Sequence, residues 1–264
     1  MQTPERSIFD VVVLASVTSV AALSLFSEYK EKYLQKMEEF HKRYTRICRE
    51  HHLYPLEVVL NHIRMCSEGN LTSEDMTKLD LSSHNLTPEE CNAFVDALTD
   101  DLFFEELSLS DCLLSEESSK ILLRGLMENK AVKRLNLKGN NIRSGAAEVL
   151  GQFLKQNTCV RSLLVEWNSL GLWDNGMRAV CEGLALNQVL LFVDLRNNQI
   201  THEGASQIAV ALKRNQCLRG LDLRWNNIGL LGGRELLEAL KYNKRLVGLE
   251  LTGKQIWSCR NAII

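Results

Sequence analysis

The sequence contains none of the short motifs that mark nucleotide-binding or hydrolytic sites. No Walker loop, GxGxxG, HExxH or GxSxG occurs in its 264 residues. The six histidines are scattered along the chain, and the sequence offers no candidate pair of nucleophile and base. We therefore expect a protein that is not an enzyme, binds no cofactor and has no small-molecule substrate.

The chain also lacks an excess of charge of either sign. It has 31 basic and 33 acidic residues, which leaves a formal balance of 31 − 33 = −2. No surplus of positive charge points to nucleic acid, and no acidic tail is present. Apolar residues make up 45% and charged residues 24% of the chain, as is typical of a soluble globular protein.

The eight cysteines do not form the groups expected of a disulfide framework or a metal site. There is no CxxC, no tight cluster and no Cys/His grouping of the metal-binding kind. Most of them lie in apolar stretches, where a free cysteine behaves as a small buried hydrophobic residue. This pattern predicts reduced thiols in a reducing compartment and no bound metal.

No apolar run is long enough to predict a membrane span. The longest candidate, residues 11–26, is 16 residues long, contains serine and threonine, and falls short of the roughly 20 residues that a spanning helix needs. It resembles the apolar part of a signal peptide, but the positive region before it is weak. We expect residues 1–36 to be an atypical N-terminal extension, with Met37 as the functional start; export and membrane insertion are the alternatives.

What the sequence does contain is a short leucine pattern, L-x-L-x-x-N-x-L/I, in seven copies. Leucines two residues apart place their side chains on one face of a strand. We expect the side chain at the asparagine position to turn inward and bond the backbone of the loop after each strand. Successive loop positions are separated by 28, 28, 28, 30, 28 and 28 residues: His84, Cys112, Asn140, Asn168, Asn198, Asn226 and Lys254.

The second half of each copy predicts a helix. In the first copy Thr87 is a candidate N-cap, Pro88 takes the first helical position, and Glu90 follows three residues after the cap. An asparagine recurs after the helices, and we expect it to end them in the left-handed conformation that asparagine tolerates. These positions are Asn129, Asn157, Asn187, Asn215 and Asn243.

A strand, loop and helix repeated every 28 residues stack into a solenoid. The pattern resembles the ribonuclease-inhibitor type of leucine-rich repeat, which implies an α/β horseshoe with parallel strands on the concave face and helices outside. The repeat domain is predicted over residues 71–257, with seven units of which the last is incomplete. Residues 37–70 contain two helical segments that are expected to cap the first unit, and residues 258–264 form a divergent tail.

Side chains between the core leucines are expected to point to the concave face. In the second half of the array an acidic row runs beside a short basic row, and three tryptophans lie next to it in the loops. Exposed aromatic residues are typical anchors of protein interfaces. We predict that the partner-binding surface comprises Lys138, Glu166, Trp167, Trp173, Asp194, Arg196, Asp222, Arg224 and Trp225.

A structural interpretation of the same residues is equally open. Aspartate and arginine could neutralise one another across adjacent strands, with each exposed pair contributing under about 1 kcal/mol. The tryptophans could pack over the edge of the loops as part of the solenoid itself.

A closer resemblance covers Met37 to about Gly253. The stretches "MEEFHKRYTRICRE", "LNLKGNNIR" and "LDLRWNNIGLLGGR" are similar to the leucine-rich head of a family of centrosome-linker proteins, in which a long coiled coil follows. The resemblance implies a non-catalytic scaffold in the cytoplasm, at the centrosome, with filamentous coiled-coil proteins as partners and no nucleic acid or membrane. Residues 1–36 and 254–264 depart from the family. The alternatives are a regulator of a GTPase or an enzyme inhibitor, and a truncated structural fragment.

Overall fold

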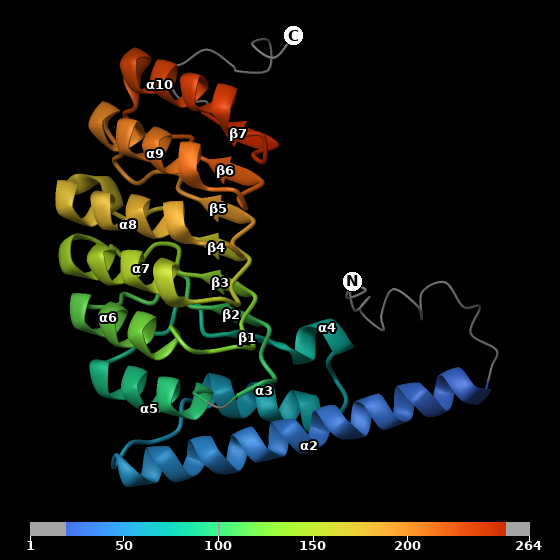
Figure 1. Cartoon of the computed structure of the whole chain (residues 1–264). Helices are drawn as coiled ribbons and strands as arrows, with labels where there is room; N and C mark the ends of the chain where they lie inside the picture. The colour runs from blue at the N-terminus through green and yellow to red at the C-terminus, as the bar shows by residue number, and fades with distance from the viewer. Residues whose placement is uncertain (1–19, 100, 252–264) are drawn as a thin grey trace.

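The computed structural model describes residues 20–99 and 101–251. Three helices come first, and strands then alternate with helices to the C-terminal end of the stack (Figure 1). The elements in order are α2 (Val20–Glu50), α3 (Glu57–Ser67), α4 (Ser73–Met76), β1 (Lys78–Asp80), α5 (Pro88–Leu98), β2 (Glu106–Ser108), α6 (Glu116–Gly125), β3 (Arg134–Asn136), α7 (Ser144–Gln156), β4 (Ser162–Leu164), the 3-10 helix η1 (Leu170–Leu172), α8 (Asp174–Leu186), β5 (Phe192–Asp194), α9 (His202–Arg214), β6 (Gly220–Asp222), α10 (Gly229–Tyr242) and β7 (Gly248–Glu250).

The strands form one parallel sheet in the order β1 to β7, and the helices of the repeats all lie on the same side of it (Figure 1). Neighbouring strands pair in register at the repeat spacing, so that Leu79 lies opposite Leu107 and Leu221 opposite Leu249. The α/β solenoid predicted from the leucine pattern is therefore confirmed. Its two extra residues lie between β4 and β5, in the unit that contains η1.

Burial explains why such short strands are stable. The middle residue of each strand and the leucine or valine two residues later point away from the concave face and into the core, as Leu135 and Leu137 do at 1% exposure each. The helices close this core with leucines one turn apart, such as Leu150 and Leu154, which are also buried. Each unit thus buries its apolar side only because a neighbour covers it.

Helices α2 and α3 cover the first unit of the stack (Figure 1). The buried face of α2 carries aromatic residues: Phe40 lies edge-on to Phe104 with ring centroids 4.9 Å apart, and Tyr44 lies edge-on to Phe94 at 6.5 Å. The Tyr44 hydroxyl also accepts a hydrogen bond from the backbone of Leu56 at 3.1 Å. Helix α2 continues without a break across residues 36 and 37, so no change of secondary structure marks the boundary predicted there.

The predicted left-handed conformation of the asparagines after the helices is wrong. Asn157, Asn187, Asn215 and Asn243 have φ between −64° and −78° and are extended. Their side chains instead form hydrogen bonds to the preceding unit. Nδ2 of Asn215 donates to the carbonyl of Leu184 in the preceding unit at 2.7 Å, and its Oδ1 accepts from two backbone N–H groups. The asparagine therefore closes the end of the previous helix and needs no left-handed turn.

Several predictions concern residues outside the described part of the chain. These are Lys254, the tail at residues 258–264, and positions 11–19 of the apolar stretch. Within the described part, seven cysteines are free thiols, and most of them are buried, as their apolar surroundings in the sequence predicted. Among the described residues, no helix combines the length and the apolar character that crossing a membrane requires.

Candidate protein-binding surface

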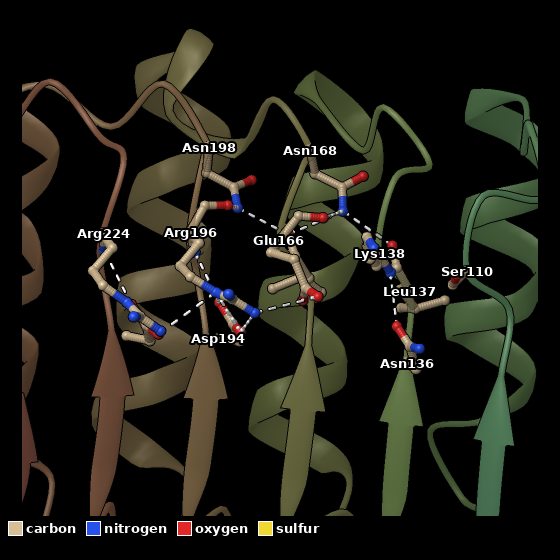
Figure 2. A network of polar contacts seen from close by, with 12 residues as sticks. Ser110, Asn136, Leu137, Lys138, Glu166, Asn168, Asp194, Arg196, Asn198 and Arg224 are labelled. Carbon is tan, nitrogen blue, oxygen red and sulfur yellow. Dashed lines mark hydrogen bonds and ion pairs between the residues drawn. The ribbon is translucent and has the colours of Figure 1, made fainter. Parts of the chain in front are cut away.

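The loop after each strand is organised by the side chain at the asparagine position. Nδ2 of Asn168 donates to the carbonyls of Leu137 and Val165, both at 3.0 Å, while its Oδ1 accepts from the backbone of Asn140 and Ile142. One buried amide thus joins the loops of two units (Figure 2). Asn140, Asn198 and Asn226 make equivalent bonds.

The two described loop positions without asparagine differ from each other. Cys112 is buried, and its thiol donates to the carbonyl of Leu81 at 3.1 Å, as a weak substitute for the amide. His84 is exposed, and its Nδ1 lies 3.0 Å from the carbonyl of Ser82 in its own loop. The first loop is therefore closed locally and lacks the bond to a preceding unit.

The residue just before each loop position has a positive φ. The series is Ser83 (64°), Asp111 (55°), Gly139 (69°), Trp167 (57°), Asn197 (53°) and Trp225 (63°). This conformation turns the backbone N–H toward the next unit, where that of Trp167 donates to the carbonyl of Arg196 at 3.0 Å. The stacking of loops therefore requires a left-handed residue at this slot, whatever its side chain.

Tryptophan is energetically unfavourable at a position with a positive φ. A residue with a side chain loses roughly 1–2 kcal/mol in the left-handed region, a cost that glycine avoids and asparagine partly escapes. The indoles of Trp167 and Trp225 are 60% and 61% exposed, so burial offsets little of this cost. The fold needs the conformation of the slot, but it does not need an indole there.

Further apolar side chains are exposed in η1, at the start of α10 and in the loops on the same edge of the sheet, where the strands end. Sequence reasoning identified Trp173, which is 56% exposed, but it missed its neighbours. Their signal was present in "GLWDNG" and "GLLGGR", where leucines fall outside the L-x-L pattern. We call these residues together the tryptophan rim: Trp167, Leu172, Trp173, Trp225, Leu230 and Leu231.

The acidic and basic rows of the concave face are paired mainly within each strand. Nε of Arg196 lies 2.9 Å and 2.8 Å from the two carboxylate oxygens of Asp194 (Figure 2). Arg224 binds Asp222 in the same way. The predicted pairing across strands is a secondary contact, in which Nε of Arg196 lies 3.5 Å from Asp222. The register places Asp194 opposite Asp222, so directly opposite side chains carry like charges. The nearest opposite charge is therefore the one two residues away in the same unit.

Glu166 extends this network toward the N-terminal side. Its Oε1 lies 3.6 Å from the guanidinium of Arg196, whereas its Oε2 is buried and has no hydrogen-bond partner in the described part of the chain. Burial, and then the charge of Asp194, raise the pKa of Glu166, while the charges of Arg196 and Lys138 oppose the shift. The carboxylate is therefore held in a place that does not favour its charge.

The predicted site residues thus fall into two groups. Asp194, Asp222 and Glu166 are buried and lie beside the arginines. The Arg196 and Arg224 side chains remain about one third exposed, at 34% and 36%. The remaining residues, Lys138, Trp167, Trp173 and Trp225, keep at least part of their side chains accessible. Within the described residues, no group of three or more His, Cys, Asp or Glu side chains is placed to hold a metal ion.

The sequence of the repeats agrees with this geometry. The leucine-rich repeat family model matches residues 186–209 and 214–237, which lie in the units of α8 to α10. The fold of the described residues is a leucine-rich repeat solenoid. In such a solenoid the exposed side chains can vary without disturbing the buried leucines, as an interaction module requires.

Among curated proteins, the chain is 49% identical over 175 residues to leucine-rich repeat-containing protein 45 of Gallus gallus. The alignment covers 66% of this chain and 25% of that protein. It is also 26% identical over 146 residues to NACHT, LRR and PYD domains-containing protein 4E of Mus musculus, covering 55% of this chain and 15% of that protein. The chain thus spans a quarter or less of the length of these relatives.

Two solved structures are similar at a lower level. The actin-binding site 2 of leiomodin-1 gives a TM-score of 0.45 with 20% identity, covering 52% of this chain and 79% of that one. The C-terminal domain of tropomodulin from Caenorhabditis elegans gives 0.48 with 18% identity, covering 60% and 93%.

Proposed function

We propose that the chain is a non-catalytic protein-binding scaffold of the centrosome linker, and that its tryptophan rim binds filamentous coiled-coil proteins. One observation carries the proposal: Trp167 and Trp225 are exposed in left-handed slots where the fold itself favours glycine or asparagine. Non-glycine residues held in such conformations concentrate at functional sites. Exposed tryptophans are also the residues most enriched among the anchors of protein interfaces.

The spacing of the two tryptophans fits a helical partner. They occupy the same slot two units apart, which at the strand spacing of the sheet is a separation of roughly 10 Å. Seven residues of an α-helix rise about 10.5 Å, so equivalent positions of a heptad repeat recur at nearly the same distance. A coiled-coil helix lying along the tryptophan rim would offer one apolar residue to each indole.

The concave face next to the tryptophan rim supports a partner that carries acidic side chains. Arg196 and Arg224 are fixed by Asp194 and Asp222, yet a third of each arginine side chain remains exposed. Because the aspartates hold the guanidinium groups in place, a partner carboxylate would meet preorganised donors. Charged positions flanking the apolar stripe are common in coiled coils, where they set the choice of partner.

The centrosomal and cytoplasmic assignment rests on similarity alone. The 49% identity to leucine-rich repeat-containing protein 45 covers the repeat region, and the chain corresponds to a quarter of that protein. We therefore propose the location together with the binding activity, and one experiment addresses both.

The test is proximity labelling in cells that express the full chain fused to a biotin ligase. The proposal predicts enrichment of filamentous coiled-coil proteins of the centrosome, and loss of this enrichment in the Trp167→Asn/Trp225→Asn variant. The matched control is Leu186→Asn/Val210→Asn, which removes two exposed apolar side chains from the helical side. The same labelled set from the rim variant and the wild type would contradict the proposal.

A further inference from the structure

The edge of the sheet where the strands begin has a composition unlike that of the tryptophan rim. The residue just before each strand lies in a hydrogen-bonded row across the units: the backbone N–H of Arg161 donates to Lys133, that of Leu191 to Arg161, and that of Arg219 to Leu191, each at 2.8 Å. Val247 donates to Arg219 at the same distance. This register places Arg161 and Arg219 two strand spacings apart.

Positive charge along this row is neutralised only in the first half of the array. Lys133 pairs with Glu105 at 2.7 Å, and Arg134 pairs with Glu106 at 3.5 Å. Further along, four exposed basic side chains have no carboxylate within ion-pair distance among the described residues. We call them the basic edge: Arg161, Arg219, Lys244 and Arg245. The guanidinium of Arg219 instead extends along the edge to the backbone carbonyl of Arg245, at 3.5 Å.

The concave face beside the basic edge has glycine at two strand positions and an exposed apolar ring at a third. The ring of Phe192 is 37% exposed and lies over Gly220, where an added Cβ would come within 2.8 Å of the ring. At Gly248 an added Cβ would meet nothing within 4 Å, and the side chain of Val247 is 83% exposed. The corresponding positions of the first three strands carry the charged residues Lys78, Glu106 and Arg134. A chain lying across β5 to β7 could therefore approach the backbone closely.

We propose that the basic edge is a second binding surface, which takes an extended acidic peptide segment of a partner protein. Two strand spacings are roughly 10 Å, close to the rise of about 9 Å over three residues of an extended peptide in the polyproline II conformation, in which side chains three residues apart lie on one face. An apolar residue between those carboxylates would lie against Phe192. Exposed Glu250 on the neighbouring row and the formal charge of −2 disfavour a large polyanion such as nucleic acid or an anionic membrane.

The experiment measures the fluorescence anisotropy of a labelled peptide that carries glutamates three residues apart with a leucine between them. A peptide with glutamine in place of each glutamate is the ligand control. The wild-type chain is compared with Arg161→Glu/Arg219→Glu, and with Arg178→Glu/Arg234→Glu, which makes the same change of charge at exposed positions on α8 and α10. Arg161→Glu/Arg219→Glu removes two exposed ion pairs with the peptide, so its affinity is expected to fall about tenfold.

The proposal predicts that the edge variant loses binding, that the helix variant stays within about twofold of wild type, and that the glutamine peptide does not bind. Equal losses in the two variants would mean that only net charge matters, and would overturn the proposal. A wild-type chain that does not bind the glutamate peptide would also overturn it. Binding of phosphatidylserine vesicles in preference to the peptide would overturn the choice of partner. Circular dichroism melts of both variants check the fold. The tryptophan rim lies at the opposite edge of the sheet, so either proposal can fail alone.

Discussion

Arg196 forms an ion pair with Asp194, two residues earlier in the same unit, with Nε 2.9 Å and 2.8 Å from the two carboxylate oxygens. The aspartate is 3% exposed, and its Oδ1 also accepts from the backbone N–H of Arg196 at 3.0 Å. The same arrangement recurs one unit later in Arg224 and Asp222. Arg196 and Arg224, which the sequence suggests are available to another protein, are thus each paired first with an aspartate of their own unit.

Asp194→Ala is expected to destabilise the chain, because it leaves Arg196 beside the acidic Glu166 without its main ion pair and removes a backbone bond. We predict a loss of about 1–3 kcal/mol in the free energy of unfolding, measured by urea denaturation. Asp80→Ala is the matched control, since Asp80 occupies the same position in the first unit but is exposed. Equal losses in the two variants would contradict a structural role for the Arg196 pair.

Glu166→Gln is expected to stabilise the chain at neutral pH. Burial raises the pKa of Glu166 above its ordinary value of 4.5, so the folded state is weakened while the carboxylate is charged. The advantage of glutamine should be full at pH values above the raised pKa, shrink as the pH falls through it, and vanish below about 4.5, where both states are protonated. Urea denaturation of both proteins from pH 4 to 8 measures this difference. A variant less stable than wild type at pH 7 would contradict the account.

Asn215→Ala should cost more than an ordinary surface substitution, because the amide bonds Leu184 in the preceding unit and the backbone of Cys217 and Leu218. Leaving these buried groups unsatisfied is expected to cost at least about 2 kcal/mol. Asn227→Ala is the control, since that residue is exposed. Hydrogen exchange should locate the loss at the start of β6; protection equal to that of wild type there would argue against the bridging role.

Gly171→Ala tests the loop that carries Trp173. In η1, an added Cβ at this position would come within 2.5 Å of Cα of Ile200 and 2.7 Å of the carbonyl of Gln199. The backbone of the next loop would have to shift, at a cost of about 1–3 kcal/mol. Gly248→Ala, where the added Cβ meets nothing within 4 Å, should be nearly neutral. Similar thermal melting temperatures for the two variants would contradict the close packing of these loops.

The parts of the structure that follow from a repeated pattern could be predicted from the sequence. The L-x-L copies define the strands, and the constant spacing defines their order in the sheet, because each apolar face can be buried only by a neighbouring unit. Thr87, Pro88 and Glu90 form the predicted capping box of α5, since all its atoms lie within one turn of the chain.

The parts that depend on contacts between units could not be predicted. The conformation of Asn187 and Asn215 depends on carbonyls in the preceding unit, which no local rule reveals. The pairing of Arg196 with Asp194 rather than with a neighbouring strand depends on which of several nearby carboxylates is reached at the shortest distance. The left-handed conformation of the residue before each loop position could not be predicted, because the residues found there, from glycine to tryptophan, share no chemical type.

The binding role of the tryptophan rim is tested by comparing stability and affinity in one variant. Asparagine is the native residue of the slot between the two tryptophans, so Trp167→Asn/Trp225→Asn should change the free energy of unfolding by less than about 1 kcal/mol per site. Binding is measured by titrating the purified variant with the coiled-coil fragment that proximity labelling recovers. We predict that its affinity falls at least about thirtyfold, as expected when an interface loses an anchor. An unchanged affinity in a fully folded variant would contradict the account.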